Sequence, residues 1–72
     1  MTRFDGRGLL RSFSCEMRLA EPIRVRDLGA FLGLPWDYSS NLIVVRGSRK
    51  LEANNLIYDD EEIILFLAVM GG

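Results

Sequence analysis

The chain has 72 residues, of which 49% are hydrophobic and 26% charged, with a formal net charge of −1. A chain of this length forms one domain with one small core, because it buries only about 60% of the surface that its unfolded form exposes. It has no histidine and a single cysteine, Cys15, which excludes disulfide frameworks, Cys/His zinc sites and catalytic triads built on imidazole, so catalysis by the chain alone is not expected.

The first expected elements are two strands. Residues 1–4 suit a short strand, and Asp5-Gly6-Arg7-Gly8 has the composition of a turn. We expect Leu9 and Leu10 to lead from this turn into the second strand.

Residues 12–19 alternate strictly between apolar and polar side chains, which predicts a half-buried strand. The apolar side consists of Phe13, Cys15, Met17 and Leu19. On this register Cys15 points into the core, where a thiol behaves as a small hydrophobe. We therefore expect Cys15 to be structural and unreactive.

A helix is predicted next, over Val25–Leu32, because apolar residues recur there at helical spacing. Gly33 suits the position after its C-terminus. Gly29 costs about 1 kcal/mol of helix propensity, so tertiary packing must hold this helix. Trp36 and Tyr38 follow in an expected loop, where we expect them to shield the small core.

The β-branched run Leu42–Val45 predicts a buried strand, followed by a tight turn at 46–49 and a short returning strand at 50–52. The final strand is predicted over Ile63–Met70, after an acidic turn at 59–62. One face of this strand would carry Ile63, Leu65, Leu67 and Val69, and the other Ile64, Phe66, Ala68 and Met70. A strand that is apolar on both faces is either central in its sheet or covered by a partner.

The order of elements predicts an α+β fold in which one main helix packs on a mixed sheet of four to five strands. Residues 1–70 would form this single domain, and Gly71 and Gly72 a flexible tail. Two terminal glycines are common in frayed chain ends. A carboxylate on two residues without side chains is, however, thin enough to enter a narrow channel of another enzyme and to meet a nucleotide phosphate there.

Three segments carry a resemblance to a known family. They are Leu42-Ile-Val-Val-Arg-Gly, Tyr58-Asp-Asp-Glu-Glu-Ile-Ile and the ending Ile64-Leu-Phe-Leu-Ala-Val-Met-Gly-Gly. With the order of elements, they resemble the ThiS/MoaD sulfur carriers, which are ubiquitin-like β-grasp proteins. Asp60 stands where this family usually has glycine, and aspartate tolerates the left-handed conformation better than most residues.

The resemblance implies that the protein is a substrate rather than an enzyme. The carboxylate of Gly72, which follows Gly71, would attack the α-phosphate of ATP inside a ThiF/MoeB-like adenylating enzyme. A persulfide sulfur donor would then displace AMP, and the resulting thiocarboxylate would deliver sulfur to an acceptor synthase. The chain itself would bind no cofactor and no metal, because ATP and the thiol belong to the partner.

The resemblance also implies an apolar sheet face that docks on the activating enzyme. The candidates are Ile64, Phe66, Ala68 and Met70, together with Leu42 and Val44. Periodicity does not determine which face of the last strand packs on the helix.

Alternatives remain open at this stage. The acceptor would be a thiazole synthase of thiamine biosynthesis, which the short chain favours, or the large subunit of a molybdopterin synthase. A ubiquitin-like modifier joined to lysines through Gly72 would share the activation step. A plain β-grasp interaction module would use neither glycine.

Other partners are not expected. Nucleic-acid binders carry a dense basic stripe, whereas the N-terminal arginines are dispersed and interrupted by acids: Arg3, Arg7, Arg11, Arg18, Arg24 and Arg26. The longest apolar run, 63–70, falls short of the ~20 residues that span a bilayer. The first residues lack the apolar region of a signal peptide. We expect a cytoplasmic protein that is a monomer when free.

Overall fold

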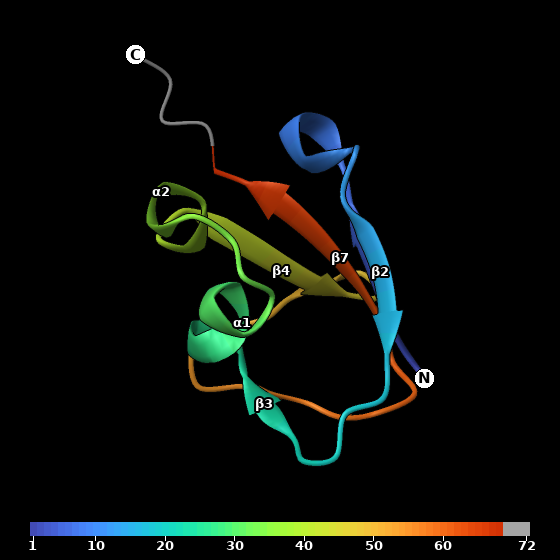
Figure 1. Cartoon of the computed structure of the whole chain (residues 1–72). Coiled ribbons are helices and arrows are strands. Elements are labelled where there is room, and N and C mark those ends of the chain that lie inside the picture. Colours follow the sequence, from blue (N-terminus) through green and yellow to red (C-terminus); the bar gives the residue numbers. More distant parts are fainter. Residues whose placement is uncertain (69–72) are drawn as a thin grey trace.

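The computed structural model describes residues 1–68 and shows an α+β fold with a mixed five-stranded sheet (Figure 1). The strand order is β2-β1-β7-β4-β5, in which β1 and β7 are parallel and the other neighbours antiparallel. The strands are β1 (Thr2–Gly6), β2 (Ser14–Met17), β4 (Leu42–Arg46), β5 (Arg49–Lys50) and β7 (Glu62–Leu67). The predicted β-grasp fold is confirmed, and β7 is the central strand.

The core lies between this sheet and the main helix, α1 (Val25–Phe31). Leu28 of α1 is fully buried, as are Phe4 of β1 and Leu65 of β7. Cys15 and Met17 of β2 pack against the same core, as their alternation predicted. These three side chains thus bring both ends of the chain and the helix into one core.

The helix forms where the sequence predicts it, within one residue. It starts after Arg24, which supplies no side-chain cap, and Asp27 lies in its first turn. Gly33 has a φ of +74°, the left-handed conformation that glycine adopts at little cost and that ends many helices. The helix is held by packing, because Leu28 and Gly29 are buried against the rest of the molecule.

The first connection differs from the prediction. Strand β1 continues to Gly6, and Leu9 and Leu10 lie in a 3₁₀ helix, η1 (Gly8–Leu10), instead of leading into β2 as a strand. A Cβ atom at Gly6 would overlap the carbonyl oxygen of Leu10, so glycine lets η1 close tightly over the end of β1. Gly8, with a φ of +58°, supplies the reversal.

The segment after Gly33 also differs from the prediction, because Trp36–Ser39 forms a short helix, α2, rather than a loop. Pro35 precedes it, and its fixed φ suits a helix start. The side chain of Trp36 is 78% exposed, so the expectation that it shields the core is wrong. Tyr38 is 42% exposed.

A second, two-stranded sheet joins β3 (Ile23–Arg24) to β6 (Leu56–Ile57). The strands are antiparallel, with Ile23 opposite Ile57. Neither was predicted, because two residues are too few for an alternating pattern. This pair ties the start of α1 to the segment that leads into β7. No helix formed by residues 1–68 is long and apolar enough to cross a membrane.

Candidate functional site

The two faces of β7 have different environments. Ile63 and Leu65 are at most 1% exposed and belong to the core beneath α1. Ile64 and Phe66 alternate with them and therefore lie on the opposite face of the sheet. Phe66 is 38% exposed, which is unusual for a large aromatic side chain in a central strand. Periodicity alone did not determine which face of β7 packs on the helix. The structure shows that Ile63 and Leu65 lie on the helix side and that Ile64 and Phe66 lie on the other side.

Strand β4 supplies the neighbours of these two residues. Val45 lies opposite Ile64, and Ile43 lies opposite Phe66. These four residues, Ile43, Val45, Ile64 and Phe66, are the open-face patch. All four are at least partly exposed to solvent.

Leu42 and Val44 do not belong to the open-face patch, which corrects the prediction. They lie opposite Leu67 and Leu65, on the face that packs against the helix, and Val44 is only 1% exposed. The sequence pattern did not predict Ile43 and Val45, because in a continuous apolar run it does not show which residues face the helix. The register becomes visible only when β4 is paired with β7.

Cations border the open-face patch on two sides. The Arg7 N–H donates to the Leu65 carbonyl at 2.9 Å, which continues the β1–β7 ladder and places Arg7 beside Phe66. On the other side, Lys50 of β5 lies opposite Val45. Neither cation forms a salt bridge with a carboxylate of residues 1–68.

Asp5 also lies on this face, opposite Ile64, but its charge is compensated. The Ser14 hydroxyl donates to it at 3.0 Å, and the Arg3 guanidinium lies 3.1 Å away. The Ser14 hydrogen bond, followed by the hydrogen bond and charge of Arg3, lowers the pKa of Asp5. Glu62, two residues before Ile64 on β7, is exposed on the same face, so the border of the patch carries charges of both signs around its apolar centre.

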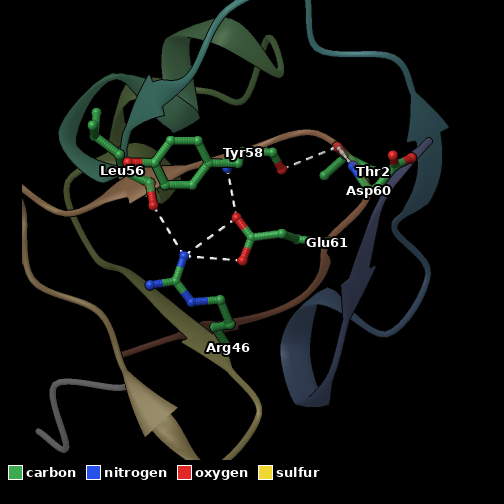
Figure 2. Close-up of polar contacts among 6 residues, drawn as sticks. All are labelled: Thr2, Arg46, Leu56, Tyr58, Asp60 and Glu61. Carbon is green, nitrogen blue, oxygen red and sulfur yellow. Dashed lines mark hydrogen bonds and ion pairs between the residues drawn. The ribbon is translucent and has the colours of Figure 1, made fainter.

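A polar network fixes the start of β7 and thereby the register of the open-face patch (Figure 2). Arg46 Nη1 donates to Glu61 Oε2 and to the Leu56 carbonyl, both at 3.0 Å. Glu61 Oε1 in turn accepts the Tyr58 N–H at 2.5 Å. One arginine of β4 thus joins β6, the acidic turn and the beginning of β7.

The acidic turn is also tied to β1. The Thr2 hydroxyl, on a residue with no exposed surface, accepts the Asp60 N–H at 3.1 Å and donates to Asp59 Oδ1 at 2.9 Å. Asp60 has a φ of +68°, so aspartate does adopt the left-handed conformation at this turn. These bonds hold the turn against the parallel neighbour of β7.

The remaining predicted site residues lie at the end of β7 or beyond the described part. Ala68 follows β7, and its N–H donates to the Asn41 carbonyl at 2.7 Å. It continues the alternation of Ile64 and Phe66 toward the end of the chain. Met70, Gly71 and Gly72 lie outside the described residues.

Cys15 has the surroundings of a structural thiol. It is partly buried against the core, and burial, with a smaller contribution from the charge of Asp5, raises its pKa. A raised pKa reduces the thiolate fraction and hence the reactivity. In the described part of the chain, no three His, Cys, Asp or Glu residues are placed to hold a metal ion.

The open-face patch is the candidate binding surface that residues 1–68 present. The carboxylates with lowered pKa values, Asp5 and Asp59, accept hydrogen bonds within turns and strand pairs. Comparison with known proteins adds no assignment: no family model and no curated protein matches this sequence. The topology itself, a mixed sheet with parallel β1 and β7 beneath one main helix, is that of a β-grasp protein.

Proposed function

We propose that this protein is a sulfur carrier of the ThiS/MoaD kind. The carboxylate of Gly72 would be adenylated by a ubiquitin-activating-type enzyme and converted to a thiocarboxylate. A sulfur-acceptor synthase, with thiazole synthase of thiamine biosynthesis the first candidate and molybdopterin synthase the second, would receive the sulfur.

One observation carries the proposal: the strand that presents Ile64 and Phe66 on the open face is also the strand that leads to Gly71-Gly72. Ala68, four residues before Gly72, is still hydrogen-bonded to Asn41, the residue that precedes β4. An enzyme that bound the open-face patch would therefore find Gly72 within a limited reach of its contact surface. Four residues span at most about 14 Å when extended.

The chemistry requires little of the chain itself. A carboxylate is a poor electrophile until one of its oxygens becomes part of a good leaving group, which AMP provides. The Gly72 oxygen forms a bond to the α-phosphorus of ATP, and pyrophosphate leaves. A persulfide sulfur then attacks the carbonyl carbon, AMP departs, and reductive cleavage of the sulfur–sulfur bond by a second thiol leaves the thiocarboxylate.

Intact-mass spectrometry tests this proposal. The protein would be purified from its own cells, to establish that Gly72 is its last residue, and incubated with ATP, Mg²⁺ and the adenylating enzyme of the same organism. We expect a mass increase corresponding to AMP, and an oxygen-to-sulfur exchange once a persulfide donor is added. Absence of both products would overturn the proposal.

Matched variants separate the tail from the fold. Removal of Gly72, or addition of one alanine after it, should abolish adenylate formation, whereas Cys15→Ala should retain it. Recovery of Gly72 in amide linkage to lysines would identify a protein modifier instead. Full cellular function after removal of both glycines would identify an interaction module.

A further inference from the structure

The end of β7 is held by a residue that lies outside the described strands. Strand β7 ends at Leu67, and the next residue, Ala68, donates its N–H to the carbonyl of Asn41 at 2.7 Å. Asn41 directly precedes β4. The bond extends the β4–β7 ladder, in which Ile43 lies opposite Phe66, by one further pair. In residues 1–68 it is the main-chain bond closest to Gly71 and Gly72.

Asn41 is in turn tied to α2. Its side-chain Nδ2 donates to the Asp37 carbonyl at 2.9 Å, and its N–H donates to the Tyr38 carbonyl at 3.1 Å. The last carbonyls of a helix have no partner within the helix, so the Asn41 side chain satisfies a group that α2 leaves open. We call Asp37, Asn41 and Ala68 the strand-end clamp.

The short helix α2 is itself anchored to α1. The Leu34 N–H donates to the Gly29 carbonyl at 2.9 Å, and Ser39 Oγ donates to the Leu34 carbonyl at 3.4 Å. A Cβ atom at Gly29 would lie 2.5 Å from the Cβ of Ser39, so the two helices are in close contact. Contacts therefore run without interruption from the core helix through α2 and Asn41 to Ala68.

The strand-end clamp lies where the chain leaves the sheet toward Gly72. Ala68 is four residues before Gly72, and four extended residues span at most about 14 Å. Without the Ala68 bond, the next residue of β7 that directs its N–H toward β4 is Phe66. The six residues beyond Phe66 would span about 21 Å, and a sphere of this radius has about three times the volume. The bond at Ala68 therefore narrows the region in which Gly72 can lie.

We propose that Asn41 is a positioning residue for the adenylation of Gly72. It acts through Ala68, by holding the end of β7 against α2 so that the chain enters the enzyme from one point of the sheet. This role rests on the proposed function. The reaction requires the Gly72 carboxylate to be aligned with the α-phosphorus of ATP, and a misplacement of about 1 Å can cost about 10²-fold in rate.

The proposal predicts which kinetic constant depends on Asn41. The open-face patch would contribute to binding of the enzyme, and the strand-end clamp to alignment after binding. Loss of the clamp should therefore lower kcat and leave KM nearly unchanged. A general loss of stability would change neither constant at a temperature where the variant is folded.

Kinetics of pyrophosphate release, with the full-length protein and its adenylating enzyme, test this split. Asn41→Leu keeps the approximate size of the side chain but removes the amide donor, and should lower kcat at least fivefold while changing KM less than twofold. Asn54→Leu is the matched control, because Asn54 is an exposed asparagine in the loop before β6. It should leave both constants at their wild-type values.

A second pair of variants tests the main-chain bond itself. Ala68→Pro removes the N–H that donates to Asn41, whereas Ala68→Val also enlarges the side chain but keeps the N–H. Ala68→Pro should have a kcat at least fivefold lower than that of Ala68→Val. Equal kcat values for the two variants would overturn the role of this bond.

Amide hydrogen exchange tests the clamp without the enzyme. In the ¹⁵N-labelled protein, Asn41→Leu should speed the exchange of the Ala68 amide at least threefold. The Phe66 amide, which lies opposite Ile43 within β7, should change less than twofold. Unchanged exchange at Ala68 would show that the Asn41 side chain does not hold the end of β7, and would overturn the proposal.

The wild-type protein separates this proposal from the proposed function. If the wild type forms no adenylate, the proposed function fails and the positioning role fails with it. If the wild type is adenylated and Asn41→Leu has the same kcat, only the positioning role is overturned. A raised KM with an unchanged kcat would also overturn it, because Asn41 would then belong to the surface that binds the enzyme.

Discussion

Val45 of β4 and Ile64 of β7 lie directly opposite each other, on the sheet face turned away from α1. Their sequence neighbours Val44 and Leu65 form the next opposite pair and are at most 1% exposed in the core. One step along either strand therefore separates a residue that stabilises the fold from one that is available to a partner. The proposed function depends on this alternation.

Substitutions on the two faces of β7 should separate stability from partner binding. Leu65→Ala removes a fully buried side chain from the core and should lower the free energy of unfolding by about 2–5 kcal/mol. Phe66→Ala, on the open face, should cost less than half as much, because Phe66 is 38% exposed. Urea denaturation measures both.

The same pair of variants should show the reverse order in adenylation. At a temperature where both are folded, Phe66→Ala should raise the KM for the adenylating enzyme at least tenfold, and Leu65→Ala should leave it near the wild-type value. A larger loss of stability for Phe66→Ala than for Leu65→Ala would contradict the assignment of the faces.

Gly29 shows why helix propensity alone misleads at one position of α1. An alanine there improves intrinsic helix propensity by about 1 kcal/mol. Its Cβ, however, would lie 2.5 Å from the Cβ of Ser39 in α2, and closer still to Ser39 Oγ. We expect Gly29→Ala to destabilise the protein by about 1–3 kcal/mol, as overpacking does.

The partner residue provides the control for this prediction. Combining Gly29→Ala with Ser39→Gly removes the two closest atoms, Oγ and Cβ, and leaves the Ser39 Cα at 2.9 Å, so part of the lost stability should return. Thermal unfolding of the two single variants and the double variant measures the coupling. Additive effects of the two substitutions would show that the α1–α2 contact does not select glycine at position 29.

The sequence was sufficient for those parts of the fold that a local pattern encodes. The alternation of Phe13, Cys15 and Met17 and the helical spacing after Arg24 both appear in the structure. The exceptions arise from contacts between distant segments. The 3₁₀ helix at Leu9 and Leu10 depends on tight closure over Gly6, which no periodicity records.

The candidate site was predictable only where a local pattern encodes it. Ile64 and Phe66 followed from the alternation within β7, but their neighbours depended on the pairing with β4. In an unbroken apolar run, a shift of one residue exchanges Ile43 and Val45 for Leu42 and Val44. Arg7 was expected in a turn, and only its backbone bond to Leu65 places it beside Phe66.

Asp60 occupies a backbone conformation that disfavours most side chains, with a φ of +68°. Asp60→Gly should therefore raise the stability relative to Asp60→Ala by about 1 kcal/mol, because glycine adopts this conformation without a steric penalty. Both substitutions remove the same exposed carboxylate, so the difference in stability between the two variants reports the cost of the backbone conformation. Equal midpoints of chemical denaturation would contradict this explanation.

Thr2 is buried, and its hydroxyl group serves the acidic turn in two ways. It accepts the Asp60 N–H and donates to Asp59 Oδ1. Thr2→Val keeps the shape of the side chain but removes the acceptor of the Asp60 N–H and leaves Asp59 Oδ1 with the Leu19 N–H as its remaining donor, which should lower the free energy of unfolding by about 1–3 kcal/mol. Thr2→Ser retains the hydroxyl group and should cost less than Thr2→Val in the same urea titration. A stability of Thr2→Val equal to that of the wild type would show that water replaces these bonds.

The stability of the protein should fall at acidic pH, in part through Asp59. The Leu19 N–H, at 3.0 Å from Asp59 Oδ1, and then the Thr2 hydroxyl lower the pKa of this carboxyl from its ordinary value of 3.8. A group with a lowered pKa in the folded state stabilises the fold above its unfolded pKa, and this contribution is lost as the pH falls through the folded pKa.

Asp59→Asn removes the titrating charge, so its free energy of unfolding should depend less steeply on pH than that of the wild type between about pH 5 and about pH 2. Asp5, whose pKa is also lowered, remains in this variant, so some acid dependence should persist. Equal slopes for Asp59→Asn and the wild type would mean that other carboxylates govern the acid transition.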